Sequence, residues 1–399
     1  MKEIQDIHDS FLYGIIVEAG CGVTSTEKLM SVAGASKTVY YSLAPYSKEY
    51  SNERYGYDYE RSVSIEFIKA CLDKESTEFD VEKINFVLAS SWQLNDGDNE
   101  KYTHGWIGLR LKGLGSYYYH ISFDRKTVAG FDRKQLLDLI GEQTIRLLHR
   151  VISMENHVKL SEGCILDQAF IDYDGRLKTN YFCLINTLEN AVNDYPLVFS
   201  SIGSRSIRFE ELMRTSDVFV INKGSFNPLH HKHVEMLNMF EQQYSKPTKK
   251  VLMISTYRPD KPHIDVDELI DRIENITGNG YDLIIMKKPL FYDAFDILKN
   301  MSSETKTFYF VIGTDTMNRI ISTDESTYGD LRSRKESIDK IVSLFKDRFH
   351  WALFDRKDIT LSQEYMLYSD MVERMIGYED DGTSSTKIRD GKIKNRLDE

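Results

Sequence analysis

Residues 217–239 read DVFVINKGSFNPLHHKHVEMLNM, and this stretch decides the fold of the second half of the chain. Its apolar start, 218–221, is short enough for a buried strand, and helical spacing begins at His231. The turn between them contains Gly224, which permits a close approach of the backbone to a ligand. Because the free amides of a helix start point toward anions, this strand, turn and helix together predict an anion site.

The same alternation of apolar runs and helical stretches continues toward the C-terminus. Further strands are expected at 251–254, 283–286, 308–312 and 351–354, and helices at 231–243, 266–276 and 337–349. Such alternation predicts an α/β fold, namely a Rossmann-like doubly wound parallel sheet with helices on both faces. We assign residues 215–399 to this domain.

The first part of the chain has an α/β pattern of its own. Strands are expected at 14–18, 38–43, 84–90, 105–111 and 117–123, and helices at 24–32, 57–73 and 133–153. This pattern predicts a separate domain over residues 1–155. Between 156 and 214 the periodicity is weak and turn glycines recur, so this segment is expected to be a connector.

Composition excludes several classes of protein. The chain has 399 residues and a formal net charge of −11, which disfavours a nucleic-acid partner. It has no signal-like start and no apolar stretch near the roughly 20 residues of a membrane helix, so we expect no membrane partner and a cytoplasmic or nuclear location. The cysteines, Cys21, Cys71, Cys164 and Cys183, are scattered without zinc-site spacing and are expected to be reduced.

Two histidines of the quoted stretch are candidate phosphate ligands. His230 and His233 are three positions apart, so both lie on one face of the first helical turn. Taken alone, such a cluster is typical of an exposed polar helix start or an adventitious metal site. After a strand and a G-S-F-N-P turn, however, the pair resembles the (H/T)-x-G-H signature of the nucleotidyltransferase α/β-phosphodiesterase superfamily. The turn itself is most similar to that of nicotinamide/nicotinate mononucleotide adenylyltransferases.

Two distant segments carry the same resemblance. The run TSSTKIR at 383–389 is similar to the family's I-S-S-T-x-I-R motif, with Thr383 in place of the leading isoleucine. Hydroxyls at a helix start followed by an arginine form a cradle for phosphate oxygens, although alone the run also fits an ordinary helix cap. The run FVIGTD at 310–315 resembles the family's strand-end G-x-D, which alone is common turn chemistry. The three motifs together span most of residues 215–399.

The resemblance implies transfer of AMP from ATP to a phosphate-bearing acceptor, with release of pyrophosphate. The expected acceptor is nicotinamide or nicotinate mononucleotide, and His230 and His233 are the expected catalytic residues. Mg²⁺ is expected to bridge the triphosphate oxygens with few or no protein ligands, so no protein metal site is assigned. The expected nucleotide-binding residues are Gly224, Ser225, Phe226, Asn227, Lys232, Gly313, Asp315, Ser384, Ser385, Thr386 and Arg389.

Lys232 departs from the family pattern, because the motif has glycine at this position. A side chain there either crowds the phosphates or adds an ammonium contact to them. Further basic residues follow two predicted strands, at 258–261 and 355–357, near the same sheet edge. For any single one of them, solvated loop charge is the ordinary interpretation.

Residues 10–153 resemble the CinA C-terminal domain, the nicotinamide-nucleotide amidase family. The similarity rests on short runs: VEAGCG at 17–22, VAGAS at 32–36, YS at 46–47, GWI at 105–107 and FDR at 123–125. The family's nucleophilic serine falls on Ala19, and Cys21, two positions on, is interpreted as a buried structural thiol. We therefore expect an inactive amidase-like domain that serves in nucleotide binding, homo-oligomer formation or regulation.

Several alternatives remain open at this point. Within the same chemistry, the alternatives are a cytidylyltransferase, a pantetheine-phosphate adenylyltransferase and another adenylyltransferase with a different phosphorylated acceptor. From another class, it is a nucleotide-binding regulatory protein with low turnover, which the departures at Ala19 and Lys232 favour. Pyrophosphate release with defined nucleotides and acceptors distinguishes these alternatives.

Overall fold

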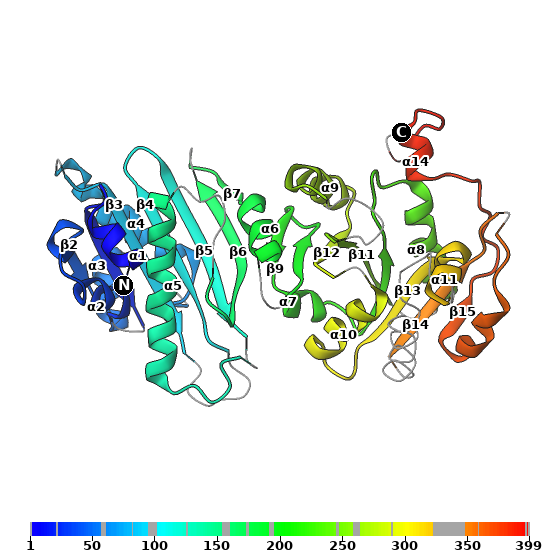
Figure 1. Cartoon of the computed structure of the whole chain (residues 1–399), viewed down its shortest axis with the longest axis horizontal. Helices are drawn as coiled ribbons and strands as arrows, with labels where there is room; N and C mark the ends of the chain where they lie inside the picture. Colours follow the sequence, from blue (N-terminus) through cyan, green and yellow to red (C-terminus); the bar gives the residue numbers. More distant parts are fainter. Residues whose placement is uncertain are drawn as a thin grey trace. The chain divides into compact units, whose positions relative to one another are not determined.

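The computed structural model describes residues 2–20, 23–56, 61–81, 83–94, 102–124, 127–153, 160–172, 175–190, 195–244, 247–257, 264–288, 290–321, 348–357, 359–395 and 397. The chain forms two compact units, Met1–Asn193 and Asp194–Glu399. Each unit has its own β-sheet, and the two are described separately (Figure 1).

The sheet of the first unit is mixed, with strand order β2-β1-β3-β4-β5-β6-β7. Its strands are β1 (Gly14–Ala19), β2 (Val39–Leu43), β3 (Phe86–Gln93), β4 (His104–Leu111), β5 (Gly115–Phe123), β6 (Cys164–Asp172) and β7 (Leu177–Thr179). β1 pairs in parallel with both β2 and β3, and the remaining pairs are antiparallel.

Helices cover this sheet. They are α1 (Lys2–His8), α2 (Thr24–Met30), α3 (Lys48–Tyr55), α4 (Ile65–Glu75), α5 (Arg133–Ser153) and α6 (Tyr181–Asn190), with 3₁₀ turns η1 (Ala35–Lys37) and η2 (Ser76–Asp80). α1 and α2 pack against α5, which is the long helix of this unit in Figure 1, and α4 packs against β3 and β4. A Cβ atom at Gly108 would lie 2.2 Å from Ile68 Cγ2, so glycine at this position lets α4 approach the sheet closely.

The second unit has an eight-stranded sheet of order β15-β14-β13-β10-β11-β12-β8-β9. Its strands are β8 (Leu197–Ser200), β9 (Arg205–Ile207), β10 (Val218–Lys223), β11 (Lys249–Ser255), β12 (Asp282–Met286), β13 (Thr307–Gly313), β14 (Phe349–Phe354) and β15 (Val372–Arg374). The six strands from β15 to β12 are parallel, and β8 and β9 extend the sheet in antiparallel pairs.

Helices lie on both faces of this sheet. They are α7 (Phe209–Met213), α8 (His231–Gln243), α9 (Val266–Gly278), α10 (Phe291–Met301), α11 (Thr314–Ile321) and α14 (Ser385–Arg389), with the 3₁₀ segment η3 (Gln363–Met371). Neighbouring residues of β13 point to opposite faces, so Tyr309 contacts Phe240 of α8 while Phe310 contacts Phe295 of α10. The fold is therefore the doubly wound α/β arrangement that the sequence predicts.

The order of the parallel strands creates a switch point between β10 and β13. From β10 the chain proceeds to β11 and β12 on one side, and then returns to β13 and β14 on the other side. Connections that leave two neighbouring strands in opposite directions open a crevice beyond their carboxyl ends, where open α/β sheets bind ligands. The residues after β10 and β13 are therefore the first place to look for a site.

Many predicted elements are confirmed. The helices expected at 133–153 and 231–243 match α5 and α8, and each strand expected in the second unit lies within one of β10 to β14. Within the described ranges, no helix has the length and apolar character needed to cross a bilayer. Cys71, Cys164 and Cys183 are free, while Cys21 lies outside the described residues.

Other elements differ from expectation. α4 begins at Ile65 because Ser64 caps it, its hydroxyl accepting from Phe67 N, whereas residues 57–60 lie outside the described ranges. The segment expected as a connector instead adds β6, β7 and α6 to the first unit and β8, β9 and α7 to the second. Of the helix expected at 337–349, residues 337–347 are not described and Phe349 begins β14.

Candidate active site

Three sequence motifs meet at the switch point of the second unit. The turn after β10 leads into α8, β13 ends at Gly313 and leads into α11, and α14 lies against the turn. Ser385 Oγ donates to Pro228 O at 3.0 Å, so segments more than 150 residues apart in the chain are neighbours in space. Figure 1 shows the red α14 beside the green α8.

His230 and His233 form a stacked pair at the start of α8. His230 caps the helix in an extended conformation, and its backbone N–H donates to Nδ1 of His233 at 3.3 Å. The ring centroids are 3.6 Å apart. Because Nδ1 of His233 accepts a hydrogen bond, its proton lies on Nε2, which leaves that atom as a donor. Nδ1 of His230 is buried and has no hydrogen-bond partner among the described residues.

Both imidazoles are neutral near pH 7. Burial, helped by the charges of His231 and Arg356, lowers the pKa of His230 to about 4. Burial and the neighbouring His230 and Arg356 hold the pKa of His233 well below its usual range. A neutral pair with an unpaired nitrogen and a free N–H donor suits a ligand that supplies both negative charge and acceptor oxygens.

These shifts predict a pH dependence of stability. The unfolded chain binds protons at these histidines near pH 6.5, whereas the folded chain binds them only at lower pH, so the free energy of unfolding of the second unit should fall as pH drops from about 6.5 toward 4. His230 alone contributes at most about 3 kcal/mol to this loss. Histidine NMR titration of the full chain checks the shift: His230 should titrate near pH 4, and added tripolyphosphate should move its pKa upward. Titration near 6.5 without any anion would contradict the prediction.

The turn between β10 and α8 is held in place from several sides. Gly224 N donates to Met253 O at 3.0 Å, and Asn227 Nδ2 donates to Glu268 of α9. Phe226 is buried with φ at +44°, and its ring meets His233 edge-on at 4.9 Å. Ser225 Oγ lies 3.5 Å from Arg272 Nη1. The peptide bond between Asn227 and Pro228 is cis.

α14 places the C-terminal motif against this turn. Ser384 caps the helix, its hydroxyl accepting from Lys387 N at 3.3 Å. Arg389 donates from Nη1 to Asn227 O and from Nη2 to Thr386 Oγ1, the latter at 3.3 Å. The hydroxyls of 384–386 and the Arg389 guanidinium therefore lie beside the same turn as the histidines.

Gly313 lies at the opposite side of the crevice. A Cβ atom there would lie 2.5 Å from Asp315 Oδ1 and 2.9 Å from Arg356 Nε, so a larger residue would displace the ends of these two side chains. Arg356 Nε is 3.5 Å from Asp315 Oδ1, and Arg356 N donates to Thr314 Oγ1 at 3.0 Å. Asp315, expected to face a ribose, is thus engaged with Arg356 in this structure.

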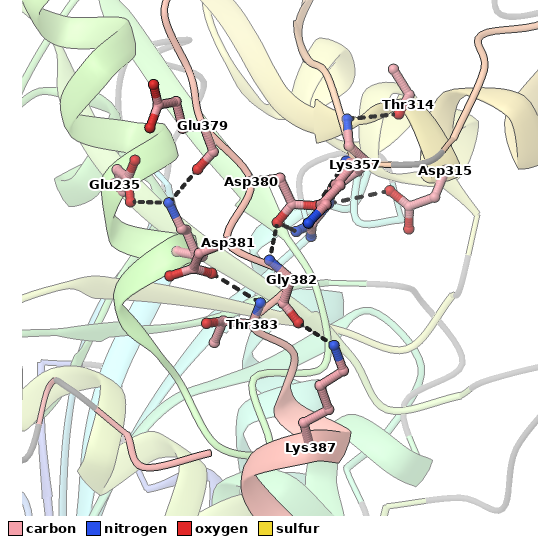
Figure 2. Close-up of polar contacts among 12 residues, drawn as sticks. Glu235, Thr314, Asp315, Lys357, Glu379, Asp380, Asp381, Gly382, Thr383 and Lys387 are labelled. Carbon is pink, nitrogen blue, oxygen red and sulfur yellow. Dashed lines mark hydrogen bonds and ion pairs between the residues drawn. The ribbon is translucent and has the colours of Figure 1, made fainter. Parts of the chain in front are cut away.

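Arg356 is a candidate site residue that the sequence pattern does not single out. It follows β14, and its positive charge lowers the pKa of both His230 and His233, which places it on the histidine side of the crevice. Asp380 Oδ1 lies 3.3 Å from Nη1 of Arg356. Figure 2 shows Asp380 between Lys357 and Gly382. The remaining guanidinium donors have no partner among the described residues, so they are free for an anion. The sequence showed a basic residue after a strand, but only the contact with Asp380 in the structure distinguishes Arg356 from an ordinary charged residue of a loop.

Asp380 is expected to influence activity through Arg356. Its carboxylate accepts from Arg356, from Lys357 N at 3.0 Å and from Gly382 N at 3.1 Å. Asp380→Asn removes the charge that orients the guanidinium, and we expect about a 10-fold lower kcat/KM, mainly in KM. Steady-state kinetics with Asp217→Asn as the control, an exposed acid paired with Lys306 away from the site, measures this effect. An Asp380→Asn enzyme with unchanged kcat/KM would contradict the assignment.

Lys232 does not point into open space. Its Nζ donates to Glu379 O at 2.6 Å, pairs with Glu235 at 2.8 Å and lies 4.9 Å from the Tyr378 ring centroid. The neighbouring His231 pairs with Asp381 at 3.0 Å. Burial raises the pKa of Asp381, but hydrogen bonds from Thr383 and His231 outweigh it, so the pKa lies below its usual range. The side chain of Lys232, at the motif's glycine position, and that of its neighbour His231 thus tie α8 to residues 378–381.

Lys223 is a second residue that the sequence pattern did not reveal. It ends β10 immediately before Gly224, and its ammonium lies 5.1 Å from the Phe291 ring centroid. Burial lowers its pKa to about 8, against the opposing charge of Asp293. The sequence did contain a signal for Lys223, namely a lysine directly before a glycine turn at the end of a predicted strand.

Among the described residues, no group of three or more histidine, cysteine, aspartate or glutamate side chains could hold a metal ion. The nearby carboxylates of Asp315, Asp380 and Asp381 each lie at ion-pair distance from Arg356 or His231. A Mg²⁺ ion at this site would therefore be held mainly by the phosphate oxygens of a bound nucleotide.

The corresponding strand end of the first unit offers no nucleophile among the described residues. Ala19 is buried at the end of β1, and the preceding Glu18 turns to cap α2, accepting from Ser25 N at 2.8 Å and Thr26 N at 3.1 Å. Cys21 and Gly22 lie outside the described residues. Ala19 offers no hydroxyl, and Glu18 is fully occupied with the helix start.

Comparison with known proteins bears on the second unit. Residues 221–391 match the model of the cytidylyltransferase-like family. A probable nicotinate-nucleotide adenylyltransferase of Lactococcus lactis is 31% identical over 105 residues, covering 23% of this chain and 51% of that protein. Its Streptococcus mutans counterpart is 28% identical over 104 residues, covering 23% and 48%. The chain thus spans about half the length of the curated relatives it matches.

Solved structures that resemble parts of this chain share lower sequence identity with it. The nicotinic acid mononucleotide adenylyltransferase of Plasmodium falciparum, complexed with NaAD, is 18% identical with a TM-score of 0.32, covering 46% of this chain and 88% of that one. A competence damage-inducible protein A of Klebsiella pneumoniae is 10% identical with a TM-score of 0.31, covering 38% and 96%.

Proposed function

We propose that the second unit transfers AMP from ATP to the phosphate of nicotinate or nicotinamide mononucleotide and releases pyrophosphate. The observation that carries the proposal is the convergence on one turn of the stacked His230 and His233 and of the α14 motif with Arg389. The names of the curated relatives, probable nicotinate-nucleotide adenylyltransferases, favour this acceptor over other phosphorylated compounds.

In this mechanism the acceptor phosphate attacks the α-phosphorus of ATP directly, and no covalent enzyme intermediate is formed. The protein contributes alignment and neutralisation of the charge on the phosphoryl oxygens. Nε2–H of His233 donates to an α/β-phosphate oxygen, and His230 binds beside it. Because both rings are neutral in the empty site, the approach of the triphosphate raises their pKa and strengthens these contacts.

The remaining residues hold the leaving pyrophosphate and the nucleosides. The hydroxyls of Ser384, Ser385 and Thr386 and the guanidinium of Arg389 bind the β- and γ-phosphates, and Arg356 adds positive charge near the histidines. Gly313 lets the nucleotide lie against the β13 backbone. When bound with the triphosphate, Mg²⁺ would neutralise part of its charge.

The test is pyrophosphate release by the full chain, with ATP and CTP each combined with nicotinate and nicotinamide mononucleotide. We expect turnover with ATP and at least one of the two acceptors. Turnover with CTP alone would support the cytidylyltransferase alternative. ATP binding by calorimetry without turnover in any combination would refute the proposed reaction and favour a nucleotide-binding regulatory protein.

A further inference from the structure

The first unit contains a buried chain of three polar side chains that the proposed function does not use. His104 lies at the start of β4, His120 on β5 and Asp167 on β6. Nδ1 of His104 is 2.9 Å from Nε2 of His120, and Nδ1 of His120 is 2.9 Å from Asp167 Oδ2. The other Asp167 oxygen accepts from Ser122 Oγ at 3.0 Å.

Burying these polar side chains costs free energy unless each proton lies between a donor and an acceptor. The side chains of Asp167 and His120 are 0% and 5% exposed. A carboxylate taken out of water costs several kcal/mol unless it is paired and hydrogen-bonded. His104 and His120 share a hydrogen bond, and the His120 ring lies at ion-pair distance from the Asp167 carboxylate, although Nδ1 of His120 and Oδ2 of Asp167 are not aligned for a hydrogen bond.

The proton positions follow from the carboxylate outward. Nδ1 of His120 must carry a proton, because a lone pair there would face the Asp167 carboxylate. When each ring carries one proton, Nε2 of His120 is an acceptor, and Nδ1 of His104 is the donor to it. This order leaves Nε2 of His104 without a proton, as the free end of the chain.

That free end is not closed off by the described protein. His104 is only partly buried, and its Nε2 makes no hydrogen bond with a described residue and is not among the buried unpaired atoms. Tyr102 stacks on the ring at 4.7 Å, which fixes its plane. His8 in the same unit is the opposite case, since it is buried and uses both nitrogens, toward Thr38 Oγ1 at 2.8 Å and Leu29 O at 3.0 Å.

The free end also lies where this sheet is expected to bind ligands. β1 is flanked by β2 and β3 in parallel, so the order 2-1-3 has a switch point at the carboxyl ends of β1 and β3. His104 is paired with Gln93 at the end of β3, and Ala19 with Ser91, on one face of the sheet. Ser91 Oγ donates to Ser62 O in the segment before α4, near Arg61.

Metal binding does not account for the cluster. Within the described ranges, no three histidine, cysteine, aspartate or glutamate side chains could hold a metal ion together. Nδ1 of His104 and both ring nitrogens of His120 each face another side chain of this cluster. If the cluster had only a structural role, Nε2 of His104 would not need to remain unpaired near the carboxyl ends of β1 and β3.

We propose that His104 is the proton acceptor of a second site in this chain, which takes a proton from water or from the hydroxyl group of a ligand at the end of β3. The proton moves from the oxygen to Nε2 of His104. The Nδ1 proton shifts toward His120, and the single positive charge gained is stabilised by Asp167. Ala19 supplies no nucleophile at the neighbouring strand end, so the site uses an oxygen that the solvent or ligand brings.

The tautomers and the accessibility are measured on the full chain. Long-range ¹H–¹⁵N spectra with His104→Gln for assignment should show His104 with Nδ1 protonated and Nε2 free at pH 7. Burial, together with His120 and Arg61, lowers the pKa of His104 to about 4, so this state should persist to pH 5. Diethyl pyrocarbonate should modify His104 but spare His8 and His120. A protonated Nε2, or a His104 as unreactive as His8, would overturn the proposal.

Hydrolysis of 4-nitrophenyl acetate provides the catalytic readout. The attacking water gives one proton to His104 as the ester bond breaks, 4-nitrophenolate leaves, and the acetic acid formed loses its proton to the solvent, so His104→Gln should lower the protein-dependent rate at least fivefold. His149→Gln, a partly exposed histidine beside Asp6 on α5, should leave the rate unchanged. Equal rates for the His104→Gln variant and the unmodified chain would overturn the proposal, whatever the outcome for adenylyl transfer.

Discussion

Replacing His233 by alanine is expected to lower kcat for pyrophosphate release 100- to 1000-fold. The residue's Nδ1 is occupied by the backbone of His230, which aims its Nε2–H toward the crevice. Loss of one such donor to a transition-state oxygen typically has this effect, which corresponds to about 2.7 to 4 kcal/mol. Because the donor acts on charge that develops during transfer, KM for ATP should change much less than kcat.

The neighbouring His231 provides a matched control in the same helical turn. Its Nε2 pairs with Asp381 instead of facing the histidine pair, so His231→Ala should reduce kcat by less than about 10-fold. Initial rates of pyrophosphate release, measured at saturating ATP and acceptor, compare kcat of the two variants. Similar losses in both would show that the start of α8 acts as a structural unit and not through His233.

Replacing Arg389 by methionine is expected to lower kcat/KM for ATP about 100-fold. The guanidinium is anchored to Asn227 O and Thr386 Oγ1, so its planar fork is already oriented beside the turn. Charge-assisted, two-pronged contacts with phosphate are about twice as strong as neutral ones, and methionine retains the length of the side chain without them.

Two further variants of α14 sharpen this result. Arg389→Lys keeps the charge but not the fork, so it should recover only part of the activity. Lys387→Met removes a charge from the same helix, but the Lys387 ammonium is bound to Gly382 O at 2.7 Å, so this variant should stay within about threefold of the unmodified chain. Initial rates over a range of ATP concentrations separate the three cases, and equal effects at 387 and 389 would point to general charge attraction.

The periodicity of the sequence predicted most of the second unit because its elements are long and strongly patterned. β13 is a run of buried apolar residues, and α8 has apolar residues at helical spacing, so residue spacing alone was enough to locate both. It was not enough for β6, since its half-buried and buried residues alternate irregularly and its pairing partner, β5, is distant in sequence. Pairing between remote strands decides such segments, and a local pattern does not contain that information.

The same distinction applies to the candidate site. His230, His233 and the α14 motif were visible as residue types at fixed spacing, and the structure brings them to one turn. The role of Asp380 was not visible, because it depends on residues 23 and 24 positions away that converge only in the fold. The contacts of Lys232 with Glu379 and Tyr378 were hidden for the same reason, so its side chain could be expected near the phosphates.

The link between α14 and the turn after β10 also sets an order of events during synthesis. Ser385 and Arg389 contact residues that were made 157 and 162 positions earlier. The sheet of the second unit can begin to pair while the chain is still growing, but its catalytic centre cannot be complete until the segment around residue 389 has been released and has closed this long loop. A nascent or prematurely ended chain would therefore hold the histidine pair without its phosphate cradle, and transfer activity should appear only after the structural core has formed.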